Sequence, residues 1–112
     1  MKSLKVKDLM EPLKCTVLAG PDGLENEVKD GYCCDLLSWV VGRAEENSAW
    51  ITVMTNINVV AVAVMAEVSC VIITEGAKPD ADVIQKAVSS GVIVLSTELS
   101  SYKAAVILGK LL

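Results

Sequence analysis

"WITVMTNINVVAVAVMAEVSCVIIT", residues 50–74, contains the pattern that decides the fold. Two five-residue runs, WITVM (50–54) and CVIIT (70–74), are rich in β-branched side chains and predict buried strands. Between them, residues 58–68 form an apolar segment that is long enough for a helix. A strand, a helix and a second strand at this spacing predict a parallel pair joined by a right-handed crossover.

The same alternation continues to the C-terminus. Residues 80–90 predict a helix capped by Asp80 and ended by Gly91, residues 92–96 a strand, and residues 99–112 a last helix. Toward the N-terminus we expect a short helix over 5–10, a strand over 15–18, a turn over 19–23, an extended segment over 27–32, and a helix over 36–44 capped by Asp35. The chain is therefore predicted to be an α/β protein with a mostly parallel central sheet.

Two of the predicted helices carry more apolar residues than one buried face needs. Every residue from Val59 to Ala66 is apolar, so this helix has no polar face. We expect it to be buried on all sides, either in the centre of the fold or against a second subunit. The last helix has a similar excess over residues 104–112, interrupted by Gly109 and Lys110. A homodimer would cover this excess.

Length and charge limit the possible classes of function. At 112 residues the chain fits a single domain, residues 1–112, with one core. Its net charge of −4 argues against nucleic-acid binding, which needs clustered Lys and Arg. No uncharged apolar run reaches the about 18 residues of a membrane span, and the charged N-terminus does not resemble a secretory signal. We expect a soluble, cytoplasmic protein.

The usual catalytic and cofactor motifs are missing. The chain has no histidine, which excludes Ser-His-Asp and Cys-His catalysis as well as histidine-bound metal. It contains neither GxxxxGK[ST] nor GxGxxG, and its cysteines lack the spacing of a metal or iron–sulfur site, so we predict no cofactor and no metal. Catalysis would have to use Glu75, Glu98 and Asp35, but a solvated acidic rim is the simpler interpretation of these carboxylates.

The four cysteines are expected to stay unpaired, because an aliphatic core of this size does not need disulfides. Cys15 and Cys70 are interpreted as buried thiols. The adjacent Cys33 and Cys34 leave a redox-sensing role open, although one of two neighbouring side chains usually faces the core.

Polar residues follow each of the predicted parallel strands. In open α/β sheets, ligands bind outside the carboxyl ends of the strands. The residues at these ends are Thr55, Asn56 and Asn58, then Thr74, Glu75 and Gly76, then Ser96 and Thr97. They predict a small-molecule or partner site at one edge of the sheet, with Gly31 and Asp35 forming a lid. The alternative is that these residues only cap helices and that Gly31 and Asp35 form a turn and a capped helix.

Four segments carry a resemblance to a known family: GYCCDLLS (31–38), WITVMTNINVVAVA (50–63), VIITEGAKPDADVIQKA (71–87) and GVIVLSTELSSYKAA (91–105). Their order and spacing resemble the DRTGG domain family, which includes a relative of the N-terminal domain of HPr kinase/phosphorylase and occurs beside CBS-domain pairs. The resemblance implies a three-layer α/β/α sandwich. Family members carry an Asp-Arg-Thr type motif at the strand end that corresponds to residues 55–58, and this chain lacks the Asp and the Arg.

The resemblance implies a non-catalytic regulatory and oligomerisation module, working as a homodimer or with another protein partner. A second hypothesis is a sensor that binds a nucleotide or an acyl phosphate at the strand edge. A third is an accessory protein of an iron–sulfur hydrogenase system, because stand-alone relatives resemble small proteins encoded near iron-only hydrogenases. The serine kinase label of some relatives derives from HPr kinase, whose P-loop catalytic domain has no counterpart in this sequence, so kinase activity is not expected.

Overall fold

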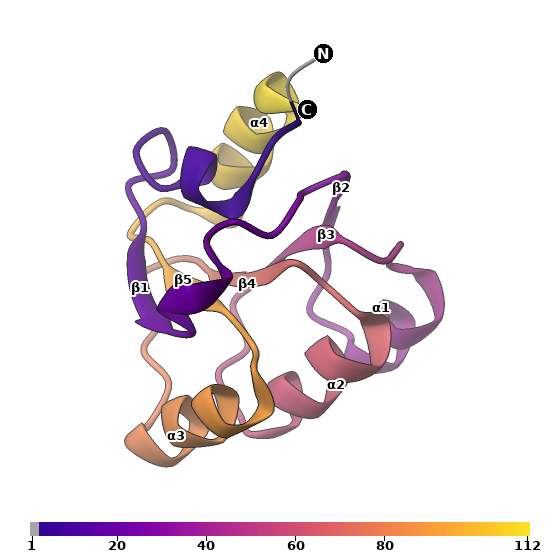
Figure 1. Ribbon diagram of the computed structural model, residues 1–112, viewed down its shortest axis with the longest axis vertical. Coiled ribbons are helices and arrows are strands. Elements are labelled where there is room, and N and C mark those ends of the chain that lie inside the picture. The colour runs from indigo at the N-terminus through magenta and orange to yellow at the C-terminus, as the bar shows by residue number, and fades with distance from the viewer. Residues whose placement is uncertain (1–2) are drawn as a thin grey trace.

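Five strands form one sheet, and helices connect most of the strands that follow one another in the chain (Figure 1). The computed structural model describes residues 3–112. In chain order the elements are the 3-10 helix η1 (Val6–Leu9), β1 (Thr16–Ala19), the 3-10 helix η2 (Pro21–Gly23), β2 (Asp30–Cys33), α1 (Leu37–Arg43), β3 (Ser48–Thr52), α2 (Asn58–Ala66), β4 (Cys70–Ile73), α3 (Ala81–Ser90), β5 (Val94–Ser96) and α4 (Ser101–Leu111). The strand order is β1-β5-β4-β3-β2, in which β2 to β5 are parallel and β1 is antiparallel to β5. The predicted mostly parallel α/β sheet is confirmed.

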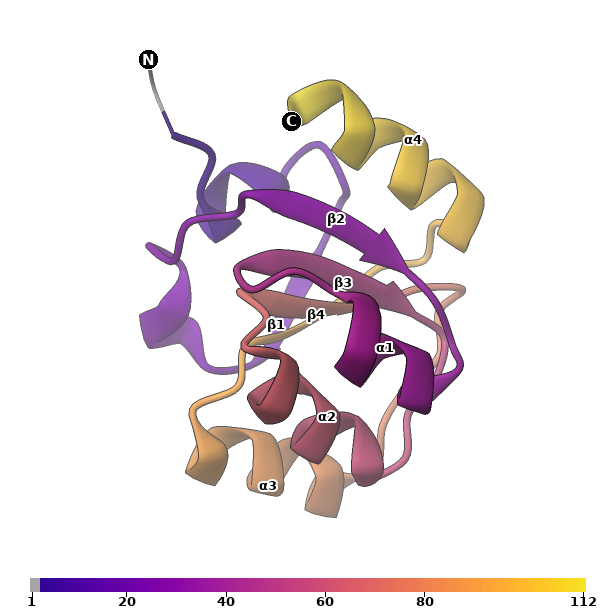
Figure 2. The same cartoon turned by 90° about the vertical axis from the view of Figure 1, so that its right-hand side faces the viewer.

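Helices cover both faces of this sheet (Figure 2). α1, α2 and α3 pack on one face, while η1 and α4 pack on the other. The three crossovers from β2 to β5 step along the sheet in the same direction, and right-handed crossovers then place their helices on the same face. The three layers confirm the α/β/α sandwich.

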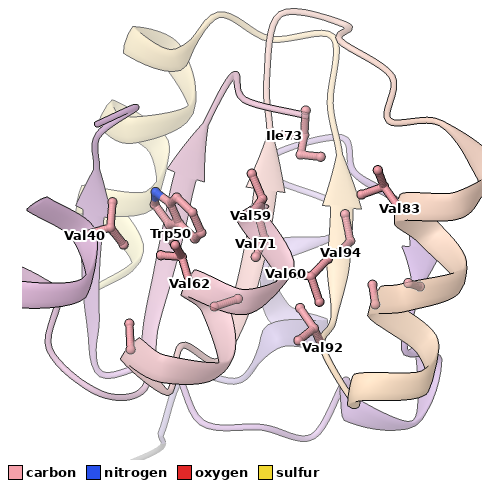
Figure 3. Close-up of a cluster of buried hydrophobic side chains, with 14 residues drawn as sticks. Val40, Trp50, Val59, Val60, Val62, Val71, Ile73, Val83, Val92 and Val94 are labelled. Atoms are coloured by element: carbon pink, nitrogen blue, oxygen red, sulfur yellow. The ribbon is translucent and has the colours of Figure 1, made fainter. Parts of the chain in front are cut away.

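The central strands are buried on both faces, as their continuous apolar runs require. Every residue of β3 and of β4 is buried. Alternate side chains enter two separate cores: Trp50 and Val71 face α1 to α3, whereas Ile51 and Ile72 face α4. Figure 3 shows the first core, with Trp50 near Val40 and Val62. Trp50 is fully buried, and its indole Nε1 donates a hydrogen bond to the Cys34 carbonyl at 2.9 Å.

Several boundaries differ from the predictions. β3 begins at Ser48 and ends at Thr52, two residues earlier at each end than predicted. The helix expected over 5–10 is the four-residue 3-10 helix η1, followed by a turn that contains Pro12. Asp80 occupies the N-cap position of α3, but its side chain makes no capping hydrogen bond. The Val83 N–H is instead bound by the Asp80 carbonyl and by Asp82 Oδ1.

Helix α2 is not buried on all sides, so the prediction of a fully central helix is wrong. The side facing the sheet, with Val59, Val60, Ala63 and Ala66, is buried. The opposite side consists of Ile57, Ala61, Val64 and Met65, named the α2 stripe below. Ile57 is 44% exposed, Val64 51% and Met65 61%. Cover by a second subunit, the other alternative, stays a prediction.

Helix α4 has the same two-sided character. Ala104 and Leu108 are buried against the sheet, while Tyr102, Val106 and Leu112 are exposed. α4 has 11 residues, and within residues 3–112 no helix combines the length and the hydrophobicity of a membrane span.

Candidate functional site

The carboxyl ends of the four parallel strands lie at one edge of the sheet, where the sequence places the candidate site. After β4 the chain turns to α3 on one face, and after β5 it turns to α4 on the opposite face (Figure 2). Adjacent parallel strands whose connections leave to opposite faces form a topological switch point, the usual position of a ligand crevice in open α/β sheets. The loops after β4 and β5 are therefore the centre of the candidate site.

Buried hydroxyl groups join these two loops and tie them to the rest of the chain. Thr74 Oγ1 and Ser101 Oγ share a hydrogen bond of 2.6 Å. Thr97 Oγ1 donates to the Leu13 carbonyl at 2.6 Å and accepts the Leu99 N–H at 3.2 Å. Thr74, Ser96 and Thr97 are all buried. The hydroxyl groups of Thr74 and Thr97 thus have partners inside the protein.

Glu75 and Gly76 form a tight turn after β4. Both have positive φ, 62° and 68°, and the Ala77 N–H binds the Thr74 carbonyl at 3.1 Å. The positive φ of Gly76 favours glycine, and a Cβ at this position would lie 2.6 Å from Glu98 Oε1, so the exposed Glu98 side chain would have to move. Glu75 Oε2 accepts the N–H of Ser101, the first residue of α4, at 3.0 Å. The carboxylate of Glu75 therefore satisfies a free N–H group of that helix.

The carboxylates nominated as a catalytic group have separate partners. Glu75 binds α4, while Glu98 lies 3.5 Å from the Lys78 ammonium group. Asp35 Oδ1 accepts hydrogen bonds from Thr52 Oγ1 at 2.7 Å and from the Val53 N–H at 2.9 Å. Asp35 thus fixes the end of β3 and does not cap α1, whose N-cap residue is Leu36.

Three polar residues that follow β3 are predicted site residues, and they differ in their hydrogen bonds. Asn56 Oδ1 accepts the Asn58 N–H at 2.9 Å and so begins α2. Within residues 3–112, the side chains of Thr55 and Asn58 make no hydrogen bond to another residue, and Asn58 is exposed. These two side chains are the members of the predicted site that remain available to a ligand.

The two residues of the predicted lid lie in different parts of the structure. Gly31 lies inside β2 and pairs with Ala49 of β3, so it belongs to the sheet and not to a loop over the strand ends. The extended segment expected over 27–32 overlaps this strand, so Gly31 is part of regular structure. Asp35 lies next to the end of β3, which it binds, and its role as a lid stays a prediction.

The thiols are poorly suited to nucleophilic chemistry. Cys34 packs against the core on the α1 side, whereas Cys33 is exposed. Cys33 is exposed, but partial desolvation of its thiol raises the pKa, and Asp35 and Cys34 raise it further. Burial raises the pKa of Cys15 to about 11 and also raises the pKa of Cys70. A raised pKa lowers the thiolate fraction at neutral pH and therefore the reactivity.

Two further cavities lie outside the loops that follow β4 and β5. A cavity of about 160 Å³ lies between β2 and α4 and is lined by residues that include Gly31, Cys33 and Leu108. A second, of about 330 Å³, lies between η2 and the C-terminal end of α3, with Asp22, Asn26 and Val88 in its lining. Of the residues predicted from the sequence, Gly31 alone lines either cavity. Among residues 3–112, no three Cys, Asp or Glu side chains form a group that could hold a metal ion.

Sequence reasoning missed Ser101, which contacts both Thr74 and Glu75. It lies inside the segment predicted as the last helix, where a serine gives no signal of a contact with a distant loop. Ser100, its neighbour, caps α4 by accepting the Lys103 N–H at 3.2 Å. A serine pair before an apolar helix is the signal that marks this helix start.

Comparisons with known proteins agree with this fold. The family model described as the DRTGG domain matches residues 8–111. A search of curated proteins finds no match to this chain. Among solved structures, the chain is similar to the CBS and DRTGG domains of the regulatory region of Clostridium perfringens pyrophosphatase, complexed with the activator diadenosine tetraphosphate. The TM-score is 0.75 at 16% identity, over 93% of this chain and 45% of that chain, so this chain spans less than half of that structure.

Proposed function

Because this chain belongs to the DRTGG domain family, we propose that it is a regulatory module that forms a homodimer and has no catalytic activity of its own. The observation that carries the proposal is the α2 stripe. It leaves three large apolar side chains, Ile57, Val64 and Met65, between 44% and 61% exposed on one helix. Contiguous exposed apolar surface of this kind marks an interaction site on a protein.

The carboxylates at the strand ends already have partners within the protein, which supports the proposed absence of catalysis. Glu75, Glu98 and Asp35 are each engaged by a different group, namely the Ser101 N–H, the Lys78 ammonium group and the Thr52 hydroxyl group. The chain has no histidine to serve as a general base. The raised pKa of Cys33 also makes this exposed thiol a weak nucleophile.

The regulatory role is supported by the architecture that the chain shares with the pyrophosphatase region. In that protein, the matched fold belongs to a regulatory region in complex with an activator. We propose that this chain likewise acts on another protein and that its apolar helix faces provide the contacts.

The dimer is tested by measuring the molar mass in solution. The mass of one chain is 11.9 kDa, so light scattering coupled to size exclusion is expected to give about twice this value at tens of micromolar protein. The expected cause is the burial of the exposed apolar helix surface in the interface. A monomer mass across this concentration range would contradict the dimer and leave the regulatory role to be tested with other proteins.

A second candidate function is a small-molecule sensor at the strand edge. The observation that favours it is that Thr55 and Asn58 have free side chains beside the switch-point loops. Amide and hydroxyl groups in this position suit a phosphate or a nucleotide base. The Ser101, Thr74 and Glu75 contacts would then form the wall of the site, not its ligand-binding groups.

A thermal-shift measurement tests the sensor. ATP, AMP, acetyl phosphate and diadenosine tetraphosphate are the probes, and a ligand present at 100 times its dissociation constant adds about 2.7 kcal/mol, or several degrees in Tm. Asn58→Ala is expected to remove this shift without lowering the Tm of the free protein, because Asn58 is exposed and its side chain has no partner among residues 3–112. Gln85→Ala, an exposed amide on α3, is the control and should keep the shift. An unchanged shift in Asn58→Ala would remove this residue from the site.

A further inference from the structure

We infer that the second copy of this chain packs on the α2 stripe, with the two α2 helices antiparallel and a two-fold axis passing beside Ala61. This inference rests on the proposed dimer and adds the surface and the arrangement. Three observations carry it: the order of side-chain sizes along the stripe, the charges near the C-terminal end of α2, and the small residues on the neighbouring helix.

The α2 stripe has a symmetric order of sizes. Ile57, Ala61 and Met65 follow one another at intervals of four residues, so they lie in one line on the outer side of α2. A small residue therefore stands midway between two large ones. In a two-fold contact centred on Ala61, Ile57 of one copy meets Met65 of the other, and Ala61 meets its own equivalent. The two helices can approach closely at the crossing point, where the side chains are smallest.

The charges around α2 select the antiparallel orientation. No charged residue occurs from Val53 to Ala66, so the α2 stripe itself brings no ion into the contact. Glu67 is the exposed residue at the C-terminal end of α2, and Glu45 and Glu46 follow the C-terminal end of the neighbouring α1. Antiparallel packing brings the acidic end of one copy toward the positive N-terminal end of the partner's helix. Parallel packing would place Glu67 against its own equivalent.

Helices α1 and α3 flank α2 and would widen the contact. A stable interface buries about 800 Å² on each partner, which is more than the nine residues of α2 supply. α1 packs along α2 on one side and α3 on the other, so the helical layer extends beyond the stripe on both sides. The exposed Ser38 and Gly42 of α1 are small, and a Cβ at Gly42 would meet no atom within 4 Å.

The outer side of α4 is the competing surface for a second copy. Its exposed Tyr102 and Val106 are accompanied by exposed Lys103 and Lys110. Closing an interface over these ammonium groups requires partners for them, whereas the α2 stripe carries no charge. The two surfaces lie on opposite faces of the sheet, so variants on each can be compared directly.

The test combines a cross-link with paired charge variants. Ala61→Cys is made in a Cys33→Ser background, which removes the exposed native thiol, and mild oxidation is followed on a non-reducing gel. A disulfide between two copies of residue 61 is expected to form at least tenfold faster than the disulfide of the matched Val106→Cys variant on α4. Val64→Glu is expected to weaken dimerisation at least tenfold, and Val106→Glu to leave it unchanged. Both valines are exposed, at 51% and 39%, so far-UV circular dichroism should show that both variants fold.

The outcomes separate this inference from the proposed dimer. A wild-type dimer that cross-links through residue 61 and dissociates in Val64→Glu supports both. A wild-type dimer that does not cross-link there, and that dissociates in Val106→Glu, overturns the α2 arrangement while the dimer stands. A wild-type monomer at tens of micromolar overturns the dimer and this inference together.

Discussion

Replacing Trp50 with alanine is expected to lower the free energy of unfolding by about 3–5 kcal/mol, the usual cost of removing a buried aromatic side chain. Trp50 is completely buried: its exposed fraction is 0%, and it is the largest of the fully buried side chains. Its indole also binds the Cys34 carbonyl at 2.9 Å and thereby holds the end of β2 against β3. The substitution removes packing from the core and leaves this carbonyl without its donor.

Urea unfolding followed by far-UV circular dichroism measures this loss. Trp39→Ala is the matched control, because Trp39 is 47% exposed and its main contact is the Arg43 guanidinium, 3.7 Å above the ring centroid. Loss of that exposed contact should cost about 0.5–1 kcal/mol. Equal costs for the two tryptophans would contradict the burial of Trp50 in the α1 to α3 core.

Thr97→Val is expected to cost about 2–3 kcal/mol, although it preserves the shape of the side chain. The hydroxyl group donates to the Leu13 carbonyl and accepts the Leu99 N–H. Valine would leave the buried Leu13 carbonyl and the half-buried Leu99 N–H without this partner, which costs more than the average net value of a hydrogen bond. Urea unfolding of this variant is expected to show a lower midpoint concentration with an unchanged m-value.

Thr55→Val is the control at the same edge of the sheet. Thr55 is partly exposed, and within residues 3–112 its side chain makes no hydrogen bond to another residue. Its replacement should change the stability by less than about 0.5 kcal/mol. A similar loss in both variants would mean that Thr97 does not act through its two backbone partners.

The order and type of the elements after residue 48 could be predicted because the signals are local. Each strand is a short β-branched run and each helix has an apolar face and a start signal, so the neighbouring residues determine the structure. The outer side of α2 could not be predicted in the same way. A helix composed only of apolar residues gives no periodicity, and the sequence does not indicate that Val59 faces the sheet while Val64 faces solvent.

The position of the candidate site could be predicted more reliably than the roles of its residues. The carboxyl ends of parallel strands must lie at the same edge, so Thr74 and Thr97 were expected to be close. Their roles depend on partners far away in the chain: Thr97 binds the carbonyl of Leu13, 84 residues earlier, and Thr74 binds Ser101. Such contacts follow from the tertiary structure and have no local signal.

The hydrogen bond between Glu75 and the Ser101 N–H makes the two ends of α4 mechanically unequal. The first turn is anchored to the loop after β4, and α4 cannot separate from the sheet at this end without also releasing the strained turn at Glu75 and Gly76. The last turn ends at the half-exposed Leu112 and has no comparable anchor among residues 3–112. Local opening of this helix therefore starts at its C-terminal end and proceeds toward the anchored turn, so amide exchange should be fastest at that end.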